Sequence, residues 1–144
     1  MTGGLAPAFV AMAATNMGHK SYTFGVGDFV CAADGSVHAL ARRARGKSYK
    51  SLDKFLADLR SEDHDAEHIN LDECDVLMLR NDPSTDAIER PWAQASGVLF
   101  GQLVASRGVM VLNDPENLSH AINKTYFQQF PEEVRPKTCI SRNV

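Results

Sequence analysis

Two short apolar runs with the same ending limit the folds open to this chain more than any other feature. One run occupies residues 74–80 (CDVLMLR) and the other residues 109–112 (VMVL), and each leads into Asn-Asp-Pro. Continuous apolar runs of this length are typical of strands buried on both faces of a parallel sheet. Because proline fixes φ and disfavours helix in the residue before it, each triplet should turn the chain off its strand.

Each run is followed by a helical pattern. Residues 86–108 carry apolar side chains at helical spacing, interrupted at Pro91 and Gly97, so we expect a bent helix or two pieces. Residues 115–130 predict another helix, with Asp114 at its N-cap. The alternation predicts a layered α/β domain with a mainly parallel sheet flanked by helices.

The other segments predict shorter elements and one inserted β-hairpin. Asp34-Gly35 is a good hairpin signal, and it lies between two extended arms within residues 29–43. The remaining expectations are a helix at 5–17, a short strand within 19–28, a helix at 51–60 capped by Ser51, a polar connection at 61–70 and a short strand within 131–141.

Composition narrows the class of protein. A chain of 144 residues with 44% apolar and 23% charged residues suits one globular domain. A net charge of −3 does not point to nucleic acid or an anionic membrane. No apolar run approaches the roughly 18–20 residues needed to cross a bilayer. Cys31, Cys74 and Cys139 form no C-x-x-C pair, so we expect buried free thiols in a reducing, cytoplasmic compartment.

Arg80 is the strongest candidate for contact with a charged ligand. It is the last residue of the first apolar run, and ligands of open α/β sheets bind at the carboxyl ends of the strands. Its planar guanidinium suits a carboxylate or a phosphate. The alternative is an ion pair within the domain to Asp82, Asp86 or Asp114, and spacing alone does not separate the two.

Other polar features carry less information. On its pattern alone, Lys124 is a solvated lysine in the helix predicted at 115–130. His64 and His68 have i, i+4 spacing, but their acidic, polar surroundings favour a solvated loop over a metal site. The glycines of residues 25–28 (GVGD) lack the third glycine and the immediate helix of a dinucleotide fingerprint.

Four segments together carry a resemblance to a known family. In chain order they read NMGHKSYTFGVGDF, AADGSV, CDVLMLRNDPSTD and GVMVLNDPENLSHAINKTYFQQFPEEVRPKTCISR. Over essentially the whole chain this order resembles the N-terminal domain of prokaryotic-type glutathione synthetases, which are ATP-grasp ligases. The combination of R-x-D-P, N-x-P and N-K…FP…P-T is fairly specific to that group.

The resemblance implies a fold and an activity. Residues 1–137 would be a Rossmann-like pre-ATP-grasp domain on the substrate side, and residues 138–144 the start of a linker or strand into an ATP-grasp module. Enzymes of this family phosphorylate a carboxylate with ATP and Mg²⁺, and an amine then attacks the acyl phosphate. The chain would form one wall of the interdomain cleft, bind neither ATP nor Mg²⁺ tightly, and be inactive alone.

The resemblance also implies site residues and partners. Arg80 and Asp82 match the family's R-x-D-P segment, which faces the substrate. Asn123 and Lys124 match its N-E-K segment near the nucleotide, without the glutamate between them. The implied partners are an ATP-grasp module in cis or in trans and a small peptide or amino-acid substrate, with no nucleic acid and no membrane.

One departure and two alternatives remain. The family has a strand before its first helix, whereas here the helical pattern starts almost at Met1, so the usual first strand is missing from the pattern. Unpaired strand edges are normally avoided, which predicts a homodimer or a rearranged strand. The alternatives are a stand-alone α/β binding or assembly module derived from this fold, and a domain of another ATP-grasp ligase, such as one adding amino acids to a protein tail.

Overall fold

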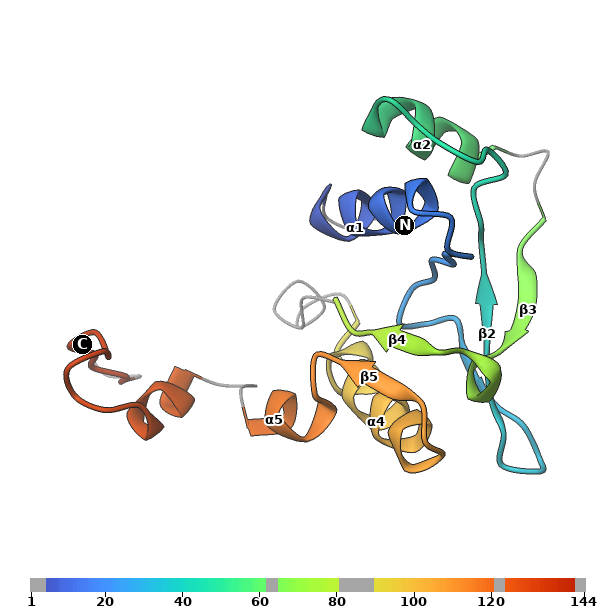
Figure 1. The fold of residues 1–144 in the computed structure, drawn as a ribbon. Coiled ribbons are helices and arrows are strands. Elements are labelled where there is room, and N and C mark those ends of the chain that lie inside the picture. Colours follow the sequence, from blue (N-terminus) through green and yellow to red (C-terminus); the bar gives the residue numbers. More distant parts are fainter. Residues whose placement is uncertain (1–4, 62–64, 81–89, 121–123, 142–144) are drawn as a thin grey trace.

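The computed structural model describes residues 5–61, 65–80, 90–120 and 124–141, and shows a mixed α/β domain (Figure 1). Its elements, in chain order, are α1 (Leu5–Asn16), β1 (Phe29–Cys31), β2 (Val37–Ala41), α2 (Leu52–Leu59), β3 (Glu67–Asn70), the 3-10 helix η1 (Leu71–Glu73), β4 (Val76–Met78), α4 (Ala93–Ser106), β5 (Met110–Leu112), α5 (Pro115–His120) and the 3-10 helix η2 (Lys124–Gln129). The predicted α/β class is confirmed.

The strands form two small sheets. β1, β2 and β3 pair antiparallel in that order, whereas β4 and β5 pair parallel. The hairpin predicted around Asp34-Gly35 is confirmed, and Gly35 has the positive φ that its turn requires. β3 lies where the polar connection at 61–70 was expected, so that expectation is wrong for its second half. Parallel pairing among the described strands is restricted to β4 and β5.

Two apolar clusters hold the domain together. The larger one lies between the sheets and α4, and its buried members are Val37, Ala39, Leu71, Leu77, Leu79, Val104 and Val109. The stacked rings of Phe29 and Phe100, with centroids 4.6 Å apart, join β1 to α4 beside it. The smaller cluster joins α1, α2 and the segment after β2 through Ala11, Ala44, Phe55 and Leu59. Figure 1 shows α1 and α2 side by side above the sheets.

The expectation that both apolar strands are buried on two faces is wrong. Only their alternate residues pack inward, and the opposite face stays open, with Val76, Met78, Met110 and Leu112 each more than 40% exposed. These four residues are paired across the strands, Val76 with Met110 and Met78 with Leu112, so they share one face. A short apolar run has the same hydropathy whether one or both of its faces are covered, so the sequence could not separate the two cases.

The predicted helices are present with changed limits. Of the helix expected at 86–108, residues 86–89 lie outside the described ranges, α4 begins after Pro91, and Gly97 lies buried inside α4 without interrupting it. Ser51 takes the N-cap position of α2, but its side chain makes no capping hydrogen bond. Of the helix expected at 115–130, the described residues form α5 and the 3-10 helix η2, and residues 121–123 lie outside the described ranges.

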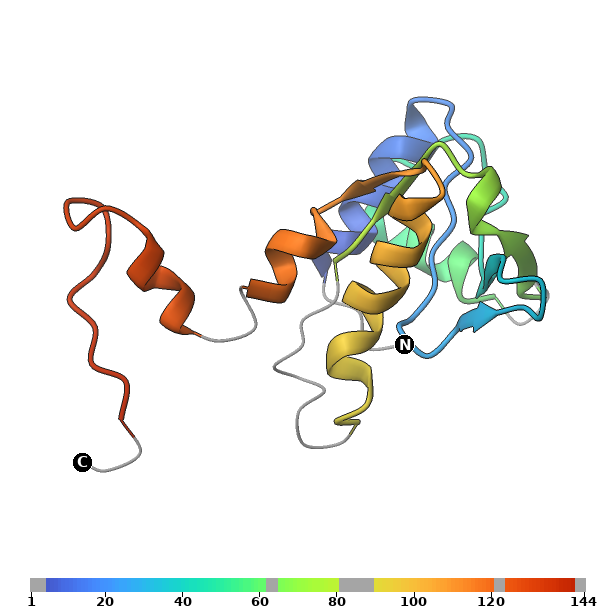
Figure 2. The ribbon, with the colours of Figure 1, turned by 90° about the horizontal axis from the view of Figure 1, so that it is seen from below.

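Two predicted strands and one burial pattern are wrong. Residues 19–28 contribute only an isolated antiparallel bridge, in which Thr23 and Arg42 exchange two backbone hydrogen bonds of 2.8 Å. Residues 131–141 contain no strand, and Figure 2 shows the chain from η2 onward set apart from the sheets and α4. The three cysteines are free, as expected, but Cys31 and Cys139 are exposed and Cys74 is only partly buried.

Candidate functional site

The carboxyl ends of β4 and β5 meet at one edge of the parallel sheet. Met78 pairs with Leu112, and the next residue, Leu79, donates its backbone N–H to the carbonyl of Leu112. The side-chain amide of Asn113 then donates to the carbonyl of Leu79 across 3.0 Å. The two strands therefore end level with each other, as their parallel arrangement predicts. The first Asn-Asp-Pro triplet, 81–83, lies outside the described residues.

The second Asn-Asp-Pro triplet begins α5. One carboxylate oxygen of Asp114 accepts hydrogen bonds from the backbone N–H groups of Glu116 at 2.8 Å and Asn117 at 3.0 Å. The backbone carbonyl of Asp114 accepts from Leu118 at 3.0 Å. The predicted N-cap is confirmed, because these contacts satisfy donors that a helix otherwise leaves free in its first turn.

Arg80 leaves this edge as an exposed side chain. It follows Leu79, which is only 5% exposed and packs in the larger apolar cluster. No ion pair joins Arg80 to an acidic residue in the described part of the chain, and Asp114 is occupied by the helix start. Asp82 and Asp86, the other two expected ion-pair partners, lie outside the described residues. The exposure of Arg80 leaves its guanidinium accessible to a ligand.

In the described part of the chain, no other predicted site residue lies at this edge. Asp82 and Asn123 fall outside the described residues. Lys124 begins η2, and Figures 1 and 2 both show η2 apart from β4 and β5. The roles expected for Asp82, Asn123 and Lys124 therefore stay predictions.

The two weaker sequence signals, the glycines of residues 25–28 and the pair His64 and His68, form no binding site among the described residues. In residues 25–28 the N–H of Gly25 donates to the Asp28 carboxylate at 2.6 Å, and the N–H of Asp28 donates to the carbonyl of Gly25 at 3.0 Å. That turn is closed on itself and is followed by β1 instead of a helix. His68 is exposed on β3, and His64 is not described. Within the described ranges no three side chains of metal-binding type lie together.

A tight packing point beneath the edge involves Gly101 of α4. A Cβ at this position would lie 2.7 Å from Cδ1 of Leu79 and 3.2 Å from Cβ of Pro115. Leu79 and Pro115 are buried, so neither has free space to move into. Glycine thus allows the backbone of α4 to approach the end of β4 and the start of α5.

Gly101→Val should destabilise the domain by about 1–3 kcal/mol, because overpacking a filled interior forces backbone shifts. The loss should occur although valine is the better helix former. Urea unfolding measures it, with Ala105→Val, at an exposed position on the same helix, as the control. Equal unfolding midpoints for the two variants would show that the close approach at Gly101 is not needed.

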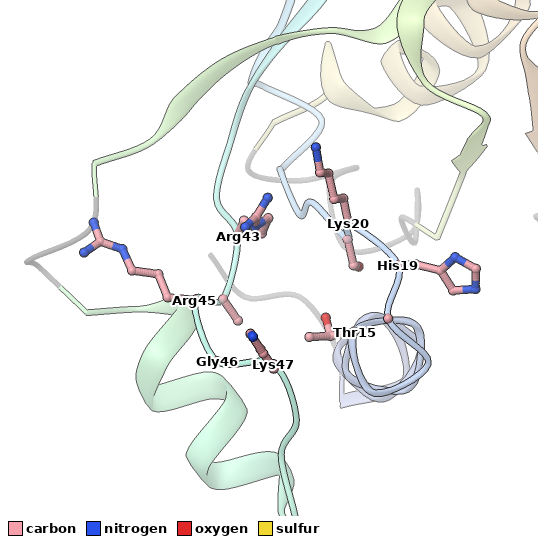
Figure 3. Close-up of a pocket in the computed structure, with 10 residues that line it drawn as sticks. Thr15, His19, Lys20, Arg43, Arg45, Gly46 and Lys47 are labelled. Carbon is pink, nitrogen blue, oxygen red and sulfur yellow. The ribbon is translucent and has the colours of Figure 1, made fainter.

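Sequence reasoning gave no function to residues 43–47. The structure places this segment against the end of α1, where the two line a pocket of about 310 Å³ (Figure 3). The available signal was charge, since Arg43, Arg45 and Lys47 occupy alternate positions of a loop. Sequence alone could not show that Lys20 comes to lie beside them.

The fold and this edge together define a class of protein. It is an α/β domain in which the ends of two parallel strands, the start of a helix and an exposed arginine lie close together. The sequence model of the family described as "Prokaryotic glutathione synthetase, N-terminal domain" matches residues 7–119. The match spans well over half of the chain, and the chain belongs to this family. Neither curated proteins nor solved structures gave a match. Among the described residues, no helix has the length and apolar character needed to cross a membrane.

Proposed function

We propose that this chain supplies the substrate-side wall of the active-site cleft in an ATP-dependent carboxylate–amine ligase of the glutathione synthetase type. The observation that carries the proposal is the family match over residues 7–119, which includes both strand ends and the start of α5. The other wall, with most of the contacts to ATP, would come from an ATP-grasp module.

The geometry of the edge supports this role for Arg80. Its side chain is exposed, it forms no ion pair with a described acidic residue, and it follows a strand whose end is fixed by the contact between Asn113 and Leu79. An arginine held in this way can bind a carboxylate through two parallel N–H donors. In the proposed reaction it would orient the carboxylate that accepts the phosphoryl group, and then stabilise negative charge on the acyl phosphate.

The nucleotide and its metal would be held mainly outside this chain. The described residues include no cluster suited to Mg²⁺, so we assign no metal ligand here. Asn123 and Lys124 would approach the nucleotide from this side, and Asp82 would lie beside Arg80 on the substrate side. When Mg·ATP is bound, it supplies the phosphoryl group that activates the carboxylate. The residues of this chain then position the carboxylate and exclude water.

The isolated chain should not recognise ATP as a nucleotide. In calorimetric titrations with Mg²⁺ present, ATP should bind no more tightly than inorganic tripolyphosphate, because the contacts to the base and the ribose lie in the other module. Comparison with tripolyphosphate removes the general attraction of phosphate for basic side chains. A preference for ATP of about tenfold or more, equivalent to ~1.4 kcal/mol, would contradict this division of the site.

A further inference from the structure

We propose that the pocket between the end of α1 and residues 43–47 binds a small phosphorylated anion, at a site that shares no residue with the strand edge. Its lining residues are Thr15, Gly18, His19, Lys20, Ser21, Arg43, Ala44, Arg45, Gly46 and Lys47. This set contains four residues with cationic side chains and no aspartate or glutamate.

The local structure explains how the cations are gathered. Ala44 is 4% exposed and is anchored in the smaller apolar cluster, and its neighbours in the chain, Arg43 and Arg45, are basic. Figure 3 shows Arg43 and Lys20 on facing sides of the pocket with Lys47 lower in the view, whereas Arg45 extends away. Lys20 arrives from a distant part of the sequence, just beyond the end of α1.

Hydrogen bonds hold the pocket wall in place before any ligand binds. The Asp58 carboxylate accepts from the backbone N–H groups of Arg45 at 2.8 Å and Gly46 at 3.1 Å, and from the Tyr49 hydroxyl. Burial, and then the hydrogen bond to Asp58, raise the pKa of Tyr49, so its hydroxyl remains a donor. The amide of Asn16, at the end of α1, exchanges two hydrogen bonds of 2.7 and 3.0 Å with the backbone of Tyr49. A wall fixed in this way loses little conformational entropy on binding.

No carboxylate lines the pocket beside Lys20, Arg43 and Lys47. The Asp58 carboxylate is occupied by the backbone of the loop and does not line the pocket. At the end of α1, the N–H groups of Gly18 and His19 bind helix carbonyls at 2.9 and 3.1 Å, so the helix end is closed without Lys20. Arg43 lies over the Tyr22 ring, 5.9 Å from its centroid, a contact that orients the guanidinium and leaves its N–H groups able to donate.

Size and charge indicate the class of ligand. A volume of about 310 Å³ is at the small end of the range for small-molecule sites. Arginine and lysine together favour phosphate, which accepts several charge-assisted hydrogen bonds. The chain as a whole carries a net charge of −3, which opposes a long polyanion such as nucleic acid. A phosphomonoester or a diphosphate fits these conditions.

Inorganic pyrophosphate is the probe that tests the site. Titrated into the full chain, it should shift the backbone amide resonances of residues 15–21 and 43–47. The double variant Lys20→Gln, Arg43→Gln should bind it about tenfold more weakly or worse, because two charge-assisted contacts are lost. The control Lys54→Gln, Lys137→Gln removes the same charge from residues outside the pocket lining and should change affinity by no more than about twofold.

A variant that preserves the charge separates the loss of charge from a loss of structure. The exchange Lys20→Arg, Arg43→Lys should keep most of the affinity, and circular dichroism should show the same fold for all variants. Equal weakening in the pocket variant and its control, shifts confined to other residues, or no binding at all would each overturn the proposal. The result does not depend on ligase activity, because Arg80 and the strand ends are unchanged in every variant.

Discussion

Phe55→Ala should be among the most destabilising single substitutions in this domain, costing about 3–5 kcal/mol of the free energy of unfolding. Phe55 is 1% exposed and lies in the cluster that joins α1, α2 and the segment after β2. Its ring meets the Tyr49 ring edge to face, with centroids 5.2 Å apart. Truncation removes the ring from its apolar surroundings and leaves a cavity that the neighbouring side chains fill only in part.

Urea unfolding followed by circular dichroism measures this loss. Lys54→Ala is the matched control, because Lys54 is exposed on the same helix and alanine suits a helix well. The control should change stability by less than about 0.5 kcal/mol. If Phe55→Ala unfolds at the same urea concentration as Lys54→Ala, the smaller cluster does not stabilise the fold.

Much of the fold follows from local signals. Asp34-Gly35 marked the hairpin, and Asp114 before Pro115 marked the start of α5, because each pattern depends on the chemistry of a few neighbouring residues. Features that depend on packing between distant segments could not be predicted from local sequence. The pairing of β3 with β2, and the open face of β4 and β5, depend on what packs against them, and no local pattern records that.

The two candidate sites also differ in whether the sequence could predict them. Arg80 could be selected from sequence because a strand end in an α/β sheet has a known place, and the structure leaves its side chain exposed. The basic pocket could not be selected, since Lys20 and Arg43 are separated in sequence and meet through tertiary contacts, which are the Thr23–Arg42 bridge and the packing of Ala44 between α1 and α2. The side chains of Asp82, Asn123 and Lys124 are not described, so their assignment still rests on resemblance.

The proposed ligase role gives Arg80→Ala a large expected effect on activity. When residues 1–144 are joined to the ATP-grasp module of a prokaryotic glutathione synthetase, the substitution should lower kcat/KM for the carboxylate substrate by about 100-fold. That loss corresponds to ~2.7 kcal/mol, as expected when a bidentate charged contact is removed. Arg80→Lys should recover part of it, because a lysine keeps the charge but not the planar fork. Stability should change little, since the side chain is exposed.

Release of phosphate by this joined protein is the direct test of the proposed role of the chain in a carboxylate–amine ligase. We expect release that requires both the carboxylate and the amine and that falls by about two orders of magnitude in Arg80→Ala. It should be unchanged in Arg60→Ala, at the exposed end of α2. Absence of turnover in the joined protein, or an Arg80→Ala variant with the same kcat/KM as the unsubstituted protein, would contradict it.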